Sequence, residues 1–198
     1  HSQGVIMNKA FEGKVAVVTG GSRGIGAAIA RRLASQGAHV ALTYQQSSSA
    51  AESLVAEIEA SGGSAEAIRS DAADPAAIQA AVAQVAQQHG HIDILVNNAG
   101  IAVFGPVDEF TLDDFDKTVA VNVRAVFAGV KAVLPHMEQG GRIVNISSTN
   151  ALRMPMVGGA VYAMSKSALS GLAQGLARGL GPRGITINNV LPGPVDTD

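Results

Sequence analysis

The chain has 198 residues, of which 47% are hydrophobic and 15% are charged, and this composition is typical of one folded globular domain rather than of a disordered segment. The formal net charge of −2 gives no basic surface for a nucleic acid or an anionic membrane, and the absence of cysteine excludes disulfides and thiolate metal sites. No apolar run reaches the roughly 18 residues that a membrane-spanning helix needs. The five histidines show no metal-ligand spacing, and His89 and His91 around Gly90 are interpreted as solvated loop residues, so no metal site is predicted.

The N-terminal residues precede the expected domain. His1 to Gly4 are typical of the remnant of a cleaved expression tag, and Met7 is the expected native start. We therefore assign residues 1–6 to this remnant and residues 7–198 to a single domain. Because the N-terminus lacks the apolar stretch of a secretory signal, a cytoplasmic location is expected.

Short apolar runs rich in β-branched residues alternate with longer alanine-rich segments. Six of these runs predict strands, at Lys14–Thr19, His39–Tyr44, Ser64–Arg69, Ile92–Asn97, Arg142–Ser147 and Ile185–Val190. After the first strand, apolar residues recur at four-residue spacing on one helix face, at Ile25, Ile29 and Leu33. Gly37 ends that helix, and the Ser47–Ser49 run is interpreted as the cap of the next one.

Capping residues also mark the later helices. Asp74-Pro75 places an N-cap and a proline at the start of one helix. Thr111–Leu134 is expected to be one long helix, because Thr111 with Asp114 resembles a capping box, and Gly159–Leu180 is the last helix. This alternation predicts an α/β fold, with a doubly wound (Rossmann) parallel sheet in three layers, α/β/α, and a ligand crevice at the carboxyl ends of the strands.

A glycine-rich turn follows the first strand and leads directly into a helix. Within Thr19–Gly26, the residues Gly20, Gly24 and Gly26 let the backbone turn tightly and approach a pyrophosphate at the helix N-terminus. The strand–turn–helix context favours a dinucleotide site over a merely structural turn.

The end of the second strand bears on which dinucleotide binds. A site for NAD(H) usually places a carboxylate there to hold the ribose 2′-hydroxyl, whereas this strand ends in Leu42–Gln45, which includes Tyr44 and no acid. Arg23 in the glycine turn offers a guanidinium group to a 2′-phosphate, with a solvated loop cation as the alternative interpretation. NADP(H) is therefore favoured over NAD(H), which the sequence leaves open.

Several separated motifs then occur in the order of a known family. They are Thr19-Gly20-x-x-x-Gly24-x-Gly26, Asn97-Asn98-Ala99-Gly100, Asn122, Ser148 and Tyr162-x-x-x-Lys166. On these residues the chain, from about Lys14 to Thr197, resembles the short-chain dehydrogenases/reductases. Its sequence as a whole is similar to that of the bacterial 3-oxoacyl-acyl-carrier-protein reductase group. Segment 150–155 resembles a subset known only as oxidoreductases.

The resemblance implies that Ser148, Tyr162, Lys166 and Asn122 are catalytic. Tyr162 and Lys166 are four residues apart in a helical segment and therefore share one face. Tyrosine is a poor acid near neutral pH, and a nearby ammonium group favours its phenolate. Tyr162 is thus expected to give a proton to a substrate carbonyl, or to take one from an alcohol, while Lys166 holds the nicotinamide ribose.

The other two members have supporting roles in this family. Ser148 is expected to orient the substrate oxygen, with Ser147 as the competing candidate. Ser148 lies fourteen positions before Tyr162, one more than the commonest gap in the family, so the extra residue is expected in the loop 150–159. Asn122 is expected to hold a water that links Lys166 to solvent, and a bend in its helix is the alternative.

The resemblance also supplies the remaining cofactor contacts. Asn97 is expected to stabilise the sheet, Asp71 to accept from the adenine amino group, and the Val195 backbone with the Thr197 hydroxyl to meet the carboxamide. The expected cofactor-binding residues are Gly20, Ser22, Arg23, Gly24, Ile25, Gly26, Tyr44, Asp71, Ala72, Asn98, Ala99, Gly100, Tyr162, Lys166, Pro192, Gly193, Val195 and Thr197.

The resemblance also bears on the C-terminal part of the domain and on the oligomeric state. Family members continue with a lid helix and a seventh strand, so the C-terminal part of the domain is expected to be missing after Asp198. Thr111–Leu134 and Gly159–Leu180 pack between subunits in many relatives, which predicts a homotetramer, with a dimer as the second choice.

The predicted function is NADPH-dependent reduction of a small carbonyl substrate: a 3-oxoacyl thioester, a ketone or an aldehyde. The alternatives are a nucleotide-binding sensor on the same fold and a purely structural oligomer component.

Overall fold

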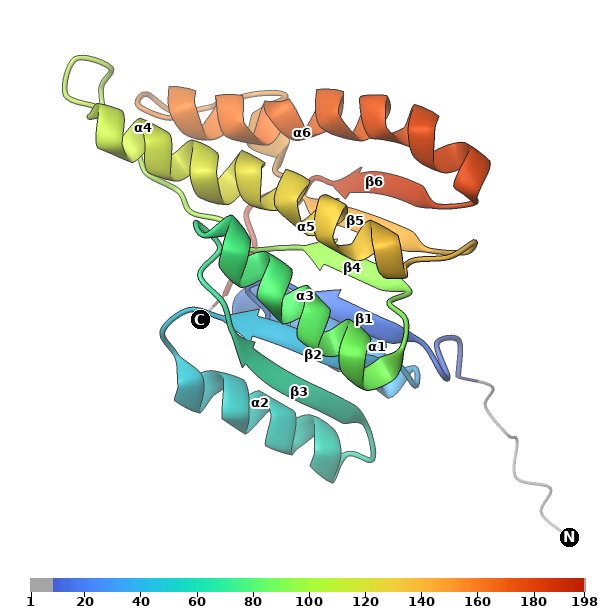
Figure 1. Ribbon diagram of the computed structural model, residues 1–198. Helices are drawn as coiled ribbons and strands as arrows, with labels where there is room; N and C mark the ends of the chain where they lie inside the picture. Colours follow the sequence, from blue (N-terminus) through green and yellow to red (C-terminus); the bar gives the residue numbers. More distant parts are fainter. Residues whose placement is uncertain (1–8, 198) are drawn as a thin grey trace, which may run out of the picture.

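The computed structural model describes residues 9–197, in which six parallel strands form one sheet (Figure 1). The strands are β1 (Val15–Val18), β2 (His39–Tyr44), β3 (Ser64–Arg69), β4 (Ile94–Asn97), β5 (Arg142–Ile146) and β6 (Thr186–Val190). Their order is β3-β2-β1-β4-β5-β6, so the chain winds outwards from β1 in both directions. The predicted doubly wound α/β/α fold is confirmed. The predicted tag remnant (residues 1–6), Met7 and Asp198 lie outside the described residues.

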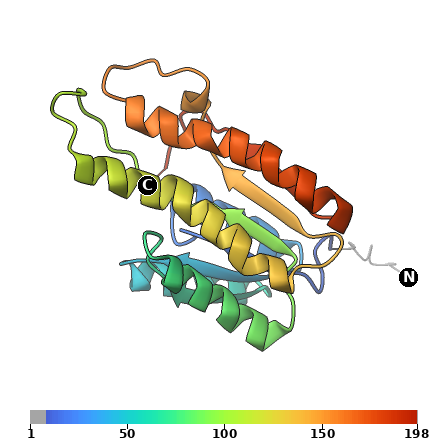
Figure 2. The ribbon, with the colours of Figure 1, turned by 45° about the horizontal axis from the view of Figure 1, so that its top comes forward.

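Helices cover both faces of this sheet. One layer consists of α1 (Gly24–Ser35) and α2 (Ser48–Ala60), which pack on β1 and β2 through side chains such as Ala30 and Leu54. The other layer contains α3 (Pro75–His89), α4 (Leu112–Val119), α5 (Ala125–Val133) and α6 (Ala160–Leu180), and Figure 2 shows α3, α5 and α6 side by side. Within residues 9–197, turns of 3₁₀-helix lie at Leu134–His136, Thr149–Ala151 and Gly181–Arg183.

The predicted N-cap residues differ in whether they make a side-chain capping bond. The Asp74 side chain accepts a hydrogen bond from Ala76 N at 2.9 Å, and Thr111 Oγ1 accepts one from Asp114 N at 3.0 Å, so both predicted caps are confirmed. The serine run does supply the N-cap of α2, at Ser47, but Ser47 makes no side-chain capping bond. Its φ of −90° and ψ of 71° lie outside the β region that directs a capping side chain towards the first helical turn.

The predicted long helix Thr111–Leu134 contains an irregular turn. Between α4 and α5, Ala120–Arg124 form a π-helical turn that contains Asn122, and such turns are frequent at functional sites. By length and mean hydropathy (1.4), the segment Leu112–His136 could cross a membrane. However, 44% of this window is buried inside the protein, where α5 packs on β4 and α3. Packing against the sheet therefore accounts for its apolar composition.

The interpretation of His89 as a solvated loop residue is wrong. His89 is the last residue of α3, which ends at Gly90 with a φ of 82°. Its ring stacks on that of His39, with the ring centroids 4.1 Å apart, and its Nε2 lies 3.3 Å from Glu66 Oε1. Because α3 includes the polar Gln87-Gln88-His89 segment, His89 lies over the sheet.

Candidate active site

A cleft of about 650 Å³ lies at the carboxyl ends of the strands, beside the point where the strand order reverses. It brings together the glycine turn, the ends of β2 and β3, and the loop after β4. The predicted cofactor-binding residues that line it are Gly20, Ser22, Arg23, Gly24, Ile25, Tyr44, Asp71, Ala72, Asn98, Ala99, Gly100 and Thr197.

The glycine turn between β1 and α1 has a backbone that other residues would strain. Gly20 and Gly24 have φ values of 61° and 54°, in the left-handed region. A β-carbon on Gly20 would lie 2.9 Å from Ala99 Cα, and one on Gly26 would overlap the Gly20 carbonyl and the Asn98 amide. Gly26 therefore serves the packing of α1 against the turn rather than the cleft itself. The first turn of α1 carries no acidic residue that would repel an anion at its N-terminus.

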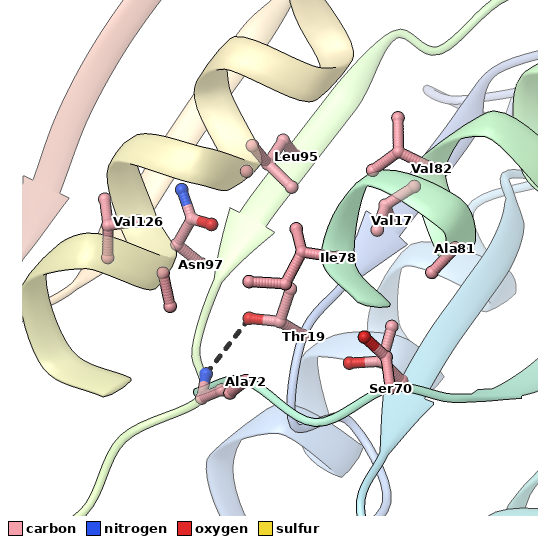
Figure 3. A pocket seen from close by; sticks show the side chains of 14 residues that line it. Val17, Thr19, Ser70, Ala72, Ile78, Ala81, Val82, Leu95, Asn97 and Val126 are labelled. Carbon is pink, nitrogen blue, oxygen red and sulfur yellow. Dashed lines mark hydrogen bonds between the residues drawn. The ribbon is translucent and has the colours of Figure 1, made fainter. Parts of the chain in front are cut away.

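Thr19 connects this turn to the loop after β4. Its Oγ1 accepts hydrogen bonds from Asn98 N at 3.0 Å and Ala99 N at 3.1 Å, and the second is the dashed line in Figure 3. Asn98 Nδ2 donates in turn to Gly20 O at 2.9 Å. Behind Thr19 lies a small pocket of about 20 Å³, lined mainly by apolar side chains of α3, β4 and α5 (Figure 3). It has room for about one water molecule, so it is not a substrate site.

Asn97 stabilises the sheet, in agreement with the role expected for it. Its Nδ2 donates to Asn145 Oδ1 at 2.9 Å, and Asn145 Nδ2 donates to Asn189 Oδ1 at 3.0 Å. These asparagines occupy the same register in β4, β5 and β6. Sequence reasoning missed Asn145 and Asn189, although an asparagine near the end of each of three successive strands was a usable signal.

Lys166 in α6 is a buried cation beside the cleft. It is only 5% exposed, and its Nζ donates to Ile146 O at 2.9 Å, at the end of β5. Burial lowers the pKa of the Lys166 ammonium group from 10.5 to about 8. Ionisable groups with such perturbed pKa values concentrate at functional sites.

Lys166 and Asn122 meet at Gly100, in the wall of the cleft. A β-carbon on Gly100 would lie 3.3 Å from Lys166 Nζ and 3.5 Å from Asn122 Oδ1. The Asn122 amide is fixed, because its Oδ1 accepts from Ile101 N at 2.9 Å and its Nδ2 donates to Ile101 O at 2.8 Å and Ser165 Oγ at 3.0 Å. The π-helical turn agrees with a bend at Asn122, and the same side chain holds the loop that lines the cleft.

Tyr162 lies one helical turn before Lys166 in α6. Its ring is 5.6 Å from that of Phe104, centroid to centroid, and Phe104 is 44% exposed in the loop after β4. Sequence reasoning missed Phe104, which carries no motif and comes near Tyr162 only through the fold.

The two candidate serines at the end of β5 have different partners. Ser147 Oγ donates to Lys166 O at 3.1 Å, so the Ser147 hydroxyl proton is not free to donate to a substrate. Ser148 Oγ accepts from Asn150 N at 3.1 Å and keeps its own proton for another acceptor. This difference favours Ser148 as the serine that contacts a substrate oxygen.

The remaining predicted cofactor-binding residues are not among those that line the cleft. Besides Gly26, these are Tyr162, Lys166, Pro192, Gly193 and Val195. The segment after β6 is held by a hydrogen bond from Thr149 N to Pro192 O at 3.0 Å, and Val195 and Thr197 line a second groove of about 440 Å³ along α1. Thr197 borders both spaces.

Several polar residues that line the cleft were not predicted. They are Thr43, Gln45, Gln46, Ser47, Ser70 and Lys117. Gln45, Gln46 and Ser47 directly follow Tyr44, at the strand end where an NAD(H) site would carry a carboxylate. Their place beside the cofactor could therefore have been predicted from the sequence. Lys117 gave no signal, because α4 reaches the cleft only through the packing of the helix layer.

Comparison with known proteins places the chain in a family. The model of the short chain dehydrogenases matches residues 14–198. The chain belongs to the short-chain dehydrogenase family. It is therefore an oxidoreductase, and the family suggested by the sequence motifs is confirmed.

Individual relatives of this short-chain dehydrogenase share the fold and much of the sequence. A short-chain dehydrogenase from Burkholderia cenocepacia J2315, solved in complex with NADP, is 57% identical with a TM-score of 0.93, over 95% of this chain and 77% of that one. The cyclic-di-GMP-binding biofilm dispersal mediator protein of Escherichia coli K12 is 49% identical over 96% of this chain and 76% of its own length. The versicolorin reductase stcU of Emericella nidulans is 41% identical over 96% and 72%, respectively. The NADP complex agrees with the predicted preference for NADP(H), while the homotetramer stays a prediction.

Proposed function

We propose that this short-chain dehydrogenase is an NADPH-dependent reductase that transfers hydride to a carbonyl group of a small molecule, with Tyr162 as the general acid. The observation that carries the proposal is the buried ammonium group of Lys166, which lies beside cleft-lining Gly100 and one helical turn from Tyr162. Burying a cation costs free energy, and ionisable groups with perturbed pKa values concentrate at functional sites, so we take Lys166 as the group that acts on Tyr162.

The residues of the cleft fit a phosphorylated dinucleotide. The backbone of the glycine turn and the N-terminus of α1 would hold the pyrophosphate, and Arg23 with Gln45–Ser47 would hold a 2′-phosphate. Asp71, in the loop after β3, would accept from the adenine amino group, and one of its oxygens already accepts from Ala73 N at 2.8 Å. When bound, NADPH supplies the hydride.

Side chains of the protein would transfer the proton to the substrate oxygen. Ser148 donates a hydrogen bond to the substrate oxygen, and Tyr162 transfers its hydroxyl proton to that oxygen as the carbonyl carbon is reduced. The Lys166 ammonium group stabilises the phenolate that Tyr162 becomes, and a proton from solvent restores the hydroxyl. Asn122 keeps the loop at Ile101 in place, so that Gly100 remains beside Lys166.

A substrate panel tests this function directly. The panel contains 3-oxoacyl thioesters, as the resemblance to the acyl-carrier-protein reductases suggests, together with simple ketones and aldehydes. Polycyclic aromatic ketones are added because a versicolorin reductase is among the relatives. We expect loss of NADPH absorbance with at least one class and a higher kcat/KM with NADPH than with NADH. NADPH binding without turnover of any class would contradict the proposal.

The similarity to a cyclic-di-GMP-binding protein favours a second candidate function, that of a nucleotide sensor. The same basic and polar cleft would then bind a nucleotide as a signal. Calorimetric titration with cyclic di-GMP separates the two functions: a sensor binds it tightly and shows no carbonyl turnover, whereas the reductase turns over a substrate of the panel.

Replacing Arg23 with alanine is expected to raise KM for NADPH by roughly tenfold and to leave KM for NADH nearly unchanged. Arg23 is exposed at the rim of the cleft, so its hydrogen bonds to a 2′-phosphate are partly screened by solvent. Steady-state kinetics with both cofactors measure the effect, and Arg178→Ala on the exposed face of α6 is the matched control. Equal changes of KM for NADPH and NADH would show that Arg23 does not recognise the 2′-phosphate.

A further inference from the structure

Two histidines and a glutamate meet at the opposite end of the sheet from the cleft. His39 begins β2, Glu66 lies within β3 and His89 ends α3. The Nε2 atoms of His39 and His89 lie 3.1 Å and 3.3 Å from Glu66 Oε1, and the three potential ligand atoms all lie within 4.8 Å of one another.

Strand register explains why these side chains share one face. His39 pairs with Ser64, and Ala41 pairs with Glu66. Because residues two apart in a strand point to the same face, all four lie on the face of Ala41, which packs in the core beneath α3. The end of α3 then brings His89 over the start of β2 and β3 (Figure 1).

The donor set, and the two spacings that involve Glu66, fit a transition-metal site. Two imidazole nitrogens and one carboxylate oxygen are a common protein set for Zn²⁺, with Zn–N and Zn–O distances of about 2.0–2.1 Å. Tetrahedral ligands at these distances are about 3.3 Å apart, close to the two N–O separations of 3.1 Å and 3.3 Å. The side chains are 19% (His39), 21% (Glu66) and 28% (His89) exposed, so an ion and a water ligand have access.

The surroundings orient these ligands. Ser64 Oγ lies 2.6 Å from His39 Nδ1, and a hydrogen bond at Nδ1 aims the other ring nitrogen at the metal. With its amide in the hydrogen-bonding orientation, Gln88 donates to both oxygens of Glu66 at 3.0 Å. The carboxyl-terminal end of α3 adds a negative potential, which favours a cation beside His89.

We propose that His39, Glu66 and His89 bind one divalent transition-metal ion, of which Zn²⁺ fits best, and that this ion joins β2, β3 and α3. The site lies at the amino ends of the strands, whereas the cleft lies at their carboxyl ends. The ion therefore acts on the stability of the fold and takes no part in hydride transfer, so the site is independent of the proposed reductase activity.

Titration of Zn²⁺ into the metal-free chain, without a histidine tag, tests the site by calorimetry and thermal unfolding. We expect one equivalent to bind and the unfolding temperature to rise by roughly 5–10 °C when free Zn²⁺ is about a hundred times its dissociation constant. His39→Gln and His89→Gln should each abolish this rise. His91→Gln is the matched control, because His91 is more exposed, at 43%, and its Nε2 lies 3.0 Å from Asp93 instead.

Co²⁺ provides a second measurement that does not depend on stability. Bound by two imidazoles, a carboxylate and water, it should give the visible absorption of a tetrahedral complex, and both histidine variants should lose it. Ser64→Ala should weaken binding by about tenfold, and Ser64→Thr should restore it, because the hydroxyl orients His39. If Zn²⁺ shows no saturable binding, or binds equally to both histidine variants, the cluster is held by hydrogen bonds alone and the proposal is overturned.

Discussion

Tyr162→Phe is expected to lower kcat/KM for carbonyl reduction by about 10²–10⁴-fold, the range in which a positioned acid contributes to catalysis. The substitution keeps the ring that lies 5.6 Å from Phe104 and removes only the hydroxyl group, so the fold and the cleft should persist. The measurement is loss of NADPH absorbance with the best substrate of the panel. NADPH binding, followed by its fluorescence, should change little, because the glycine turn that would hold the phosphates lies between β1 and α1, away from α6.

Tyr44→Phe is the matched control for this prediction, since Tyr44 is the other of the two tyrosines in the chain. Tyr44 lines the cleft at the end of β2, and β1 and β4 lie between β2 and β5, the strand that Ser148 follows. Its loss of a hydroxyl should therefore affect KM for NADPH and not kcat. If Tyr162→Phe kept wild-type turnover, the proton would come from another group and the proposed role of Tyr162 would be wrong.

The fold was predictable because its signals are local. Asp74 and Thr111 cap helices through bonds to residues two and three positions further on, and the apolar runs that form the strands are continuous in sequence. At Ser47 the position of the cap was predicted, but the backbone angles prevent the side-chain capping bond that the residue type suggests. The prediction failed at His89, where a polar segment continues the helix, because Val85 and Ala86 remain buried one turn earlier.

The candidate site was predictable where a short motif determines the backbone. The glycine turn and Asn98–Gly100 meet through Thr19, and each is readable as a contiguous stretch. Lys117 and Phe104 lie near the site through helix packing and loop geometry, which no local pattern encodes. The same reason hides the metal ligands, since 27 residues separate His39 from Glu66 and 23 separate Glu66 from His89. Only the register of β2 with β3 and the length of α3 bring them together.

The buried ammonium group of Lys166 should give the cofactor-free protein a characteristic dependence of stability on pH. Its pKa is lowered by burial from 10.5 to about 8, so between these pH values the unfolded chain holds a proton that the folded protein has released. The free energy of unfolding should therefore rise with pH across this window, by about 3 kcal/mol relative to a variant without the group. This contribution is lost as the pH falls across the same window, and it is gone once the folded protein takes up the buried charge below about 8.

Lys166→Met isolates this effect, and urea unfolding at a series of pH values measures it. The methionine variant should lack the rise, although it starts from a different baseline because Ile146 O loses its hydrogen bond from Lys166 Nζ. Lys166→Arg keeps a cation that does not titrate in this range, so it should lack the rise as well. A wild-type profile parallel to both variants would mean that Lys166 is not desolvated in the folded protein. If the rise is found, the protein stores an unfavourable charge beside Tyr162, and Lys166→Met should remove that charge together with the reductase activity.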